Sequence, residues 1–207
     1  MNMRGSYGIS MEDFSVFKYS KDIELLLKTI LHLRNKFSFN NTLFLYFFDS
    51  YKEARKSIGV YIPDTCSALS IEDSIVCISS KYWYKQQYGS IDSSIIHEFI
   101  HVIINSFSVE CPLWIHEGLA QFYSGEYMKF NKIRRSIPKN LDVYSLTYDD
   151  ELLYYLSSKL MEILIEQYSE NDIIERIKNI NTFKGFKDDD ILGEKSLNKL
   201  LLGKKKL

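Results

Sequence analysis

Two histidines four positions apart, His97 and His101, with Glu98 beside the first, form the pattern in this chain best suited to chemistry. On an α-helix, residues four apart lie on the same face, one turn above the other. Two imidazoles placed in this way can bind one zinc ion, and the neighbouring carboxylate can act as a general base. The segment therefore predicts a metal site on a helix.

A second carboxylate, Glu117, follows after a short reversal of the chain, in the segment from 114 to 120. Together with His97 and His101 it would give three protein ligands and leave one coordination position open. Three ligands and an open position are typical of catalytic zinc, whereas a structural site fills all four positions. We therefore predict a catalytic zinc site in which Glu98 is the general base.

The residues from 90 to 108 are apolar on nearly all sides, which predicts a buried helix. Gly89 and Ser90 can end the preceding segment and cap this helix, and Asp92 suits its positively polarised first turn. A buried carboxylate at Glu98 is costly unless a metal, or water bound to it, pairs with the charge. The alternative is chance, with the histidines as hydrogen-bonded core residues and Glu98 as an exposed charge.

The segment from His97 to His101, followed by a Trp-x-x-Glu-Gly-x-Ala pattern that ends at Ala120, resembles the motifs of the gluzincin zinc metallopeptidases. The most similar pattern is that of the compact peptidase MA-like family. In these families the glutamate before the glycine is the third zinc ligand, which carries over to Glu117. The resemblance is strongest over residues 90–125.

The resemblance implies an α+β, zincin-like fold, with a small mixed sheet, an active-site helix and a mostly helical C-terminal lobe. The zinc site would belong to a lobe of residues 1–126 and the helical lobe to residues 127–207, unless both form one compact domain. The implied activity is hydrolysis of peptide bonds. Endopeptidase activity is slightly favoured, because no anchor for a free amine is recognisable.

Two further roles come from the resemblance. Many gluzincins carry an aspartate four residues after the third ligand, which accepts a hydrogen bond from a histidine ring; here Gln121 takes that place, without the charge. A tyrosine at the start of the helix that follows stabilises the oxyanion in such enzymes. Tyr154 matches that position best, and Tyr155 is the second candidate.

Two other classes of protein remain open. One is a catalytically idle zinc-binding domain that recognises a peptide or protein partner, which the replacement of the aspartate by Gln121 would suit. The other is a structural zinc domain, which needs a fourth ligand, His116 or Cys111. As an adjacent helical residue points about 100° away from Glu117, His116 is more simply a packing or rim residue.

Hydrophobic periodicity predicts the remaining elements. Helices are expected at residues 21–36, 51–58, 150–167, 168–180 and 196–202. Strands are expected at residues 43–48 and 74–79. In resembling enzymes the strand before the active-site helix forms the sheet edge and pairs with the substrate backbone. Residues 75–79 are therefore a candidate substrate strand, with an ordinary inner strand as the equal alternative.

Composition excludes some classes of partner. A formal net charge of −1 over 207 residues gives no electrostatic case for nucleic acid or a membrane surface. The aromatic cluster at 82–88 favours a packed loop. The polar region 131–148 is predicted to be a solvated surface loop, and residues 185–190 are predicted to form an acidic turn. Three widely spaced cysteines suit a reducing compartment. Without a signal-peptide core or a membrane-length apolar run, we expect a cytoplasmic protein acting on peptides or proteins.

Overall fold

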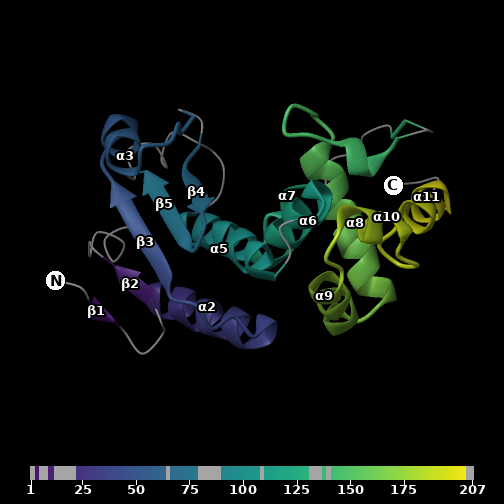
Figure 1. Cartoon of the computed structure of the whole chain (residues 1–207), viewed down its shortest axis with the longest axis horizontal. Helices are drawn as coiled ribbons and strands as arrows, with labels where there is room; N and C mark the ends of the chain where they lie inside the picture. Colours follow the sequence, from purple (N-terminus) through teal and green to yellow (C-terminus); the bar gives the residue numbers. More distant parts are fainter. Residues whose placement is uncertain are drawn as a thin grey trace. The chain divides into compact units, whose positions relative to one another are not determined.

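The computed structural model describes residues 3–4, 9–11, 22–63, 66–78, 90–107, 110–130, 137–138 and 141–203 (Figure 1). The chain divides into two compact units, residues 1–106 and residues 107–207. The first unit contains a mixed sheet with helices, and the second is built from helices. The fold class is therefore α+β with a small sheet and mostly helical content, as predicted.

The first unit contains a five-stranded sheet in the order β1-β2-β3-β5-β4. Its strands are β1 (Met3–Arg4), β2 (Ile9–Met11), β3 (Leu43–Phe48), β4 (Ala68–Ile71) and β5 (Ser74–Ile78). The three neighbouring strands β2, β3 and β5 run parallel, whereas β1 and β4 are antiparallel to their neighbours. The predicted strands at 43–48 and 74–79 correspond to β3 and β5.

The edge position considered for residues 75–79 is wrong, and the alternative of an inner strand is confirmed. Strand β5 lies between β3 and β4, so the edge strand on this side of the described sheet is β4. A tight turn through Glu72, whose φ of 51° is in the left-handed region, folds β4 back antiparallel to β5. This turn contains no glycine, so the hairpin has no strong sequence signal.

Three helices complete the described part of this unit: α2 (Ile23–Phe37), α3 (Tyr51–Ile58) and α5 (Ile91–Phe107). Side chains cap the first two, since Asp22 accepts from the amide of Leu25 and Ser50 from that of Glu53. Helix α3 covers one face of the sheet through a core of Tyr51, Ala54, Ile62, Val76 and Ile78. Alternation along β5 turns Ile75 and Cys77 to the opposite face.

The second unit consists of helices. They are α6 (Leu113–Ser124), α7 (Tyr127–Phe130), the 3₁₀ turn η1 (Val143–Ser145), α8 (Leu153–Gln167), α9 (Glu170–Asn179), α10 (Phe183–Asp188) and α11 (Glu194–Gly203). Helices α6 and α8 pack against each other (Figure 1). The predicted helices at 150–167, 168–180 and 196–202 correspond to α8, α9 and α11.

Two predictions for this unit need correction. The acidic turn predicted at 185–190 falls largely in helix α10, which Thr182 caps by accepting from the amide of Gly185. The region 131–148, predicted to be a solvated loop, contains η1, whose residue Tyr144 is buried. The Tyr144 hydroxyl lies 2.8 Å from the carbonyl oxygen of Phe186 and 2.7 Å from that of Leu192, contacts that periodicity cannot predict.

The predicted aromatic cluster at 82–88 lies outside the described residues. Across the part of the chain that is described, we find no helix with both the length and the apolar character needed to span a membrane.

Candidate metal centre

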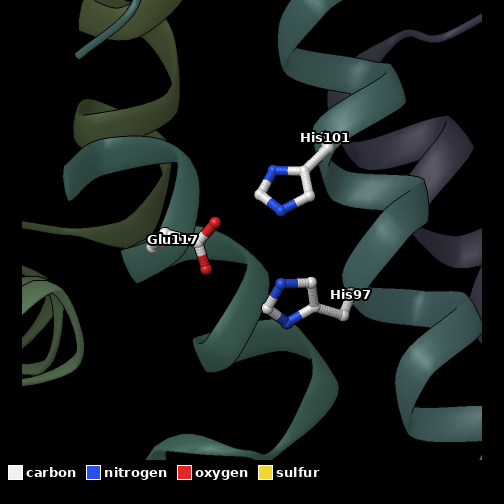
Figure 2. A group of neighbouring side chains, drawn as sticks. All are labelled: His97, His101 and Glu117. Carbon is white, nitrogen blue, oxygen red and sulfur yellow. The ribbon is translucent and has the colours of Figure 1, made fainter. Parts of the chain in front are cut away.

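Helix α5 carries the two predicted histidine ligands on one face. The ring centroids of His97 and His101 are 4.9 Å apart, with their planes at 77°. Most of the helix is buried, and His101 itself is 8% exposed. The i, i+4 spacing therefore produces the pair of adjacent imidazoles that the sequence predicts, as Figure 2 shows.

Helix α6 carries Glu117, which is only 2% exposed. The helix begins after Pro112 and ends at Gly125, whose φ of 77° is the left-handed conformation usual at such an end. Ligand atoms of His97, His101 and Glu117 all lie within 4.8 Å of one another. In Figure 2 the Glu117 carboxylate points toward the two imidazoles.

This donor set fits a zinc ion. Two imidazole nitrogens and one carboxylate oxygen are a common ligand set for catalytic zinc, at about 2.0–2.2 Å from the metal. Ligand atoms around a tetrahedral zinc lie roughly 3.3 Å apart, so small side-chain rotations would close the three residues on an ion. Among the residues that are described, this is the one such group, and it contains neither His116 nor Cys111.

A close approach of two helices lies next to Glu117. A β-carbon added at Gly118 would lie 2.7 Å from the backbone carbonyl oxygen of Ser157 and 3.1 Å from the β-carbon of Met161, both on α8. Only glycine permits this approach, because real β-carbons essentially never come within 3.0 Å of another heavy atom. The smallness of residue 118 thus sets the distance between α6 and α8.

The predicted base, Glu98, contacts the edge strand. Its Oε2 atom accepts a hydrogen bond from the backbone amide of Ser70, 28 positions earlier in the chain, at 2.8 Å. Sequence reasoning did not find this contact. The donor is a backbone group, which every residue except proline has, so no residue type could signal it.

The charge of Glu98 reaches the thiols of two cysteines in the same unit, Cys66 and Cys77. Burial, and secondarily the negative charge of Glu98, raises the pKa of the Cys66 thiol to about 11. The same two causes raise the pKa of the Cys77 thiol still further, together with a contribution from Cys66. Both thiols are free and stay protonated at neutral pH.

The remaining predicted residues lie in the second unit. Gln121 is 1% exposed, and neither atom of its amide group has a hydrogen-bond partner among the described residues. A bond from the amide to a histidine ring is therefore not formed here. Tyr154 is 40% exposed, whereas Tyr155 is 1% exposed, and no described residue is bonded to its hydroxyl. His116 is half-buried beside Glu117.

No family model matches this chain, and comparison with curated proteins and with solved structures likewise finds no significant similarity.

Proposed function

We propose that this protein is a zinc-dependent hydrolase that cleaves peptide bonds, with a zincin-like fold of the gluzincin type. The observation that carries the proposal is the approach of three ligand atoms, from His97, His101 and Glu117, to within 4.8 Å of one another. A predicted base, Glu98, directly follows the first ligand in the sequence. The mixed sheet and the helical second unit also support the proposed fold.

The proposed chemistry assigns one role to the metal and the others to side chains. A zinc ion bound by these residues would acidify a water molecule and polarise the substrate carbonyl. Glu98 would take a proton from the attacking water and deliver it to the leaving amine. His97, His101 and Glu117 would hold the ion with one open position for the reacting groups.

Tyr154 is the better candidate for the oxyanion donor on geometric grounds. Ser157 and Met161 mark the face of α8 that contacts α6. At about 100° per residue, Tyr154 points within about 20° of Met161 around the helix axis, whereas Tyr155 points about 120° away. The partial exposure of Tyr154 would also let its hydroxyl reach a substrate.

The state of the cysteines supports the expected compartment. Cys66, Cys77 and Cys111 are all free thiols. Free thiols are usual in the reducing cytoplasm, and disulfides are usual in secreted domains. We therefore propose a reducing compartment, with peptides or proteins as substrates.

The test combines metal analysis with turnover. The purified protein, loaded with zinc, should cleave members of a peptide library, lose this activity on chelation and regain it when zinc is added. Glu98→Gln should keep one zinc per chain and lose turnover, whereas His97→Ala should lose the zinc. A Glu98→Gln variant as active as the wild type would refute the assigned base.

The same experiment separates the alternatives. Zinc-loaded protein that binds library peptides without cleaving them would identify the catalytically idle binding domain. Cobalt substitution reports the coordination number through its visible spectrum. A closed site with four protein ligands would identify a structural zinc domain and overturn the proposal.

A further inference from the structure

The backbone of edge strand β4 points alternate groups toward β5 and away from it. In an antiparallel pair, every second residue exchanges both of its backbone hydrogen bonds with the partner strand, and the residues between them direct theirs outward. Ser67 belongs to the first kind, since its carbonyl accepts from the amide of Ile78 at 3.0 Å. The pairing register then makes Ala68 and Ser70 the residues with outward backbone groups.

The outward amide of Ser70 is the group that donates to Glu98. This bond joins the edge of the sheet to the side chain that follows the first metal ligand on α5. A glutamate side chain has several rotatable bonds, so an undirected one would sample many positions. The amide is held in place by the ladder on the other side of β4, and it therefore fixes one carboxylate oxygen of Glu98.

We propose that the backbone amide of Ser70 is a positioning group that holds Glu98 in the orientation needed for a general base. The inference rests on the proposed hydrolase function. A carboxylate has two oxygens and about four acceptor sites, so one oxygen held by the amide leaves the other able to take a proton from water. A lysine or arginine side chain would neutralise the charge of the carboxylate. The amide is uncharged, so it orients the carboxylate and leaves its negative charge in place.

A second hydrogen bond holds strand β4 close to Ser70. The Cys66 thiol donates to the carbonyl oxygen of Ala68, the other outward residue, at 2.7 Å. Side chain and backbone therefore brace β4 just before Ser70. The neighbouring thiols are protonated at neutral pH and bring no second anion to Glu98.

A proline at position 70 removes this donor selectively. Proline has no N–H, and it is tolerated on an edge strand where the amide points away from the ladder. In the zinc-loaded protein, we expect Ser70→Pro to lower kcat at least tenfold, with KM and zinc affinity within threefold of the wild type. The control variant Ser70→Ala keeps the backbone amide and should therefore retain most of the wild-type kcat. A Ser70→Pro protein with wild-type kcat overturns the inference.

A second measurement needs no activity. In a double-mutant cycle on metal-free protein, urea midpoints are compared for Ser70→Pro, Glu98→Ala and the double variant. We expect the two changes to be non-additive, because each removes the same bond. Ala68→Pro removes a neighbouring outward amide instead and should be additive with Glu98→Ala. Additive effects of Ser70→Pro and Glu98→Ala would show that the bond is not formed and overturn the inference.

The two failures can be told apart. If zinc-loaded wild-type protein cleaves no peptide, the proposed function fails and the inference with it, whatever the cycle shows. If the wild type is active and Ser70→Pro keeps its kcat, only the inference fails. If Ser70→Pro does not fold, the backbone amide of residue 70 can be replaced by an ester, by incorporating the α-hydroxy acid analogue of serine. The ester lacks the same N–H hydrogen, so we expect the same loss of kcat.

Discussion

Gly118 packs directly against the backbone of Ser157, so closely that a β-carbon on the glycine would lie 2.7 Å from the Ser157 carbonyl oxygen. The contact lies one residue after the predicted ligand Glu117. A backbone atom cannot rotate away as a side chain can, so any larger residue at 118 must displace one helix from the other. The position of Glu117 therefore depends on a residue that carries no chemistry of its own.

Gly118→Ala should destabilise the protein by about 1–3 kcal/mol, the usual range for overpacking a well-packed interior. This is the net expectation although alanine favours helix by about 0.5–1 kcal/mol over glycine. Urea unfolding measures the change, and zinc affinity should fall as well. Gly185→Ala is the control, because its β-carbon would meet only side-chain atoms of Ile180 and Thr182. Equal effects of the two changes would contradict the assigned close approach.

The two candidate tyrosines should separate on substitution by phenylalanine. Tyr154→Phe should lower kcat by about 10²-fold, the usual effect of removing one oxyanion donor, with zinc content unchanged. Tyr155→Phe should leave the fold as stable or slightly more stable, since the lost hydroxyl is buried and bonded to no described residue. Steady-state kinetics and thermal unfolding give both answers, and the reverse pattern in kcat would assign the oxyanion to Tyr155.

Gln121→Met should have opposite effects on folding and on metal binding. In metal-free protein the change removes a buried amide that no described residue satisfies, so stability should rise by about 1 kcal/mol. If the amide turns to a histidine ring when zinc binds, its loss should weaken zinc affinity by about 10–100-fold. Zinc titration with a competing chelator measures the second effect. Unchanged affinity would remove Gln121 from the metal site.

The thiols should be slow to react in the native protein. With a pKa raised to about 11 by burial and by Glu98, the Cys66 thiol is ionised to roughly 0.1% at pH 8, and the thiolate is the reactive form. The native protein should therefore react slowly with a disulfide reagent. After unfolding, all three cysteines should react rapidly. Rapid modification of native Cys66 at pH 8 would contradict its burial beside Glu98.

The same shift predicts a loss of stability in alkaline solution. The unfolded chain releases the Cys66 proton near the ordinary thiol pKa of 9.0, and burial raises that pKa to about 11 in the folded chain. Between these values the folded state binds more protons, so the free energy of unfolding falls as pH rises. The urea midpoint of the wild-type protein should decline from pH 8 to 11, and the midpoint of the Cys66→Ala variant should decline less steeply. An equal decline would assign the loss to other groups.

The parts of the fold that depend on local signals were predictable. The helix at 91–107 follows from its apolar residues, and the ligands on it follow from a four-residue spacing that any α-helix converts into one face.

The parts that depend on distant contacts were not predictable. Strand β4 takes the sheet edge through a turn at Glu72 that has no glycine, so residues 75–79 remained a candidate edge strand until the pairing was known. Tyr144 is buried, and its hydroxyl meets carbonyl groups more than forty positions later in the chain. The bond from Ser70 to Glu98 likewise joins residues 28 positions apart through a backbone group.

The three ligand residues lie close together in sequence, all between positions 97 and 117. Closing so short a loop costs little chain entropy, and it needs no strand of the sheet to be in place. An ion bound there would therefore be able to join the two helices early, before distant pairings such as β2 with β3 have formed. Zinc is expected to speed refolding as well as to slow unfolding, a kinetic effect that a site assembled from remote segments would not produce.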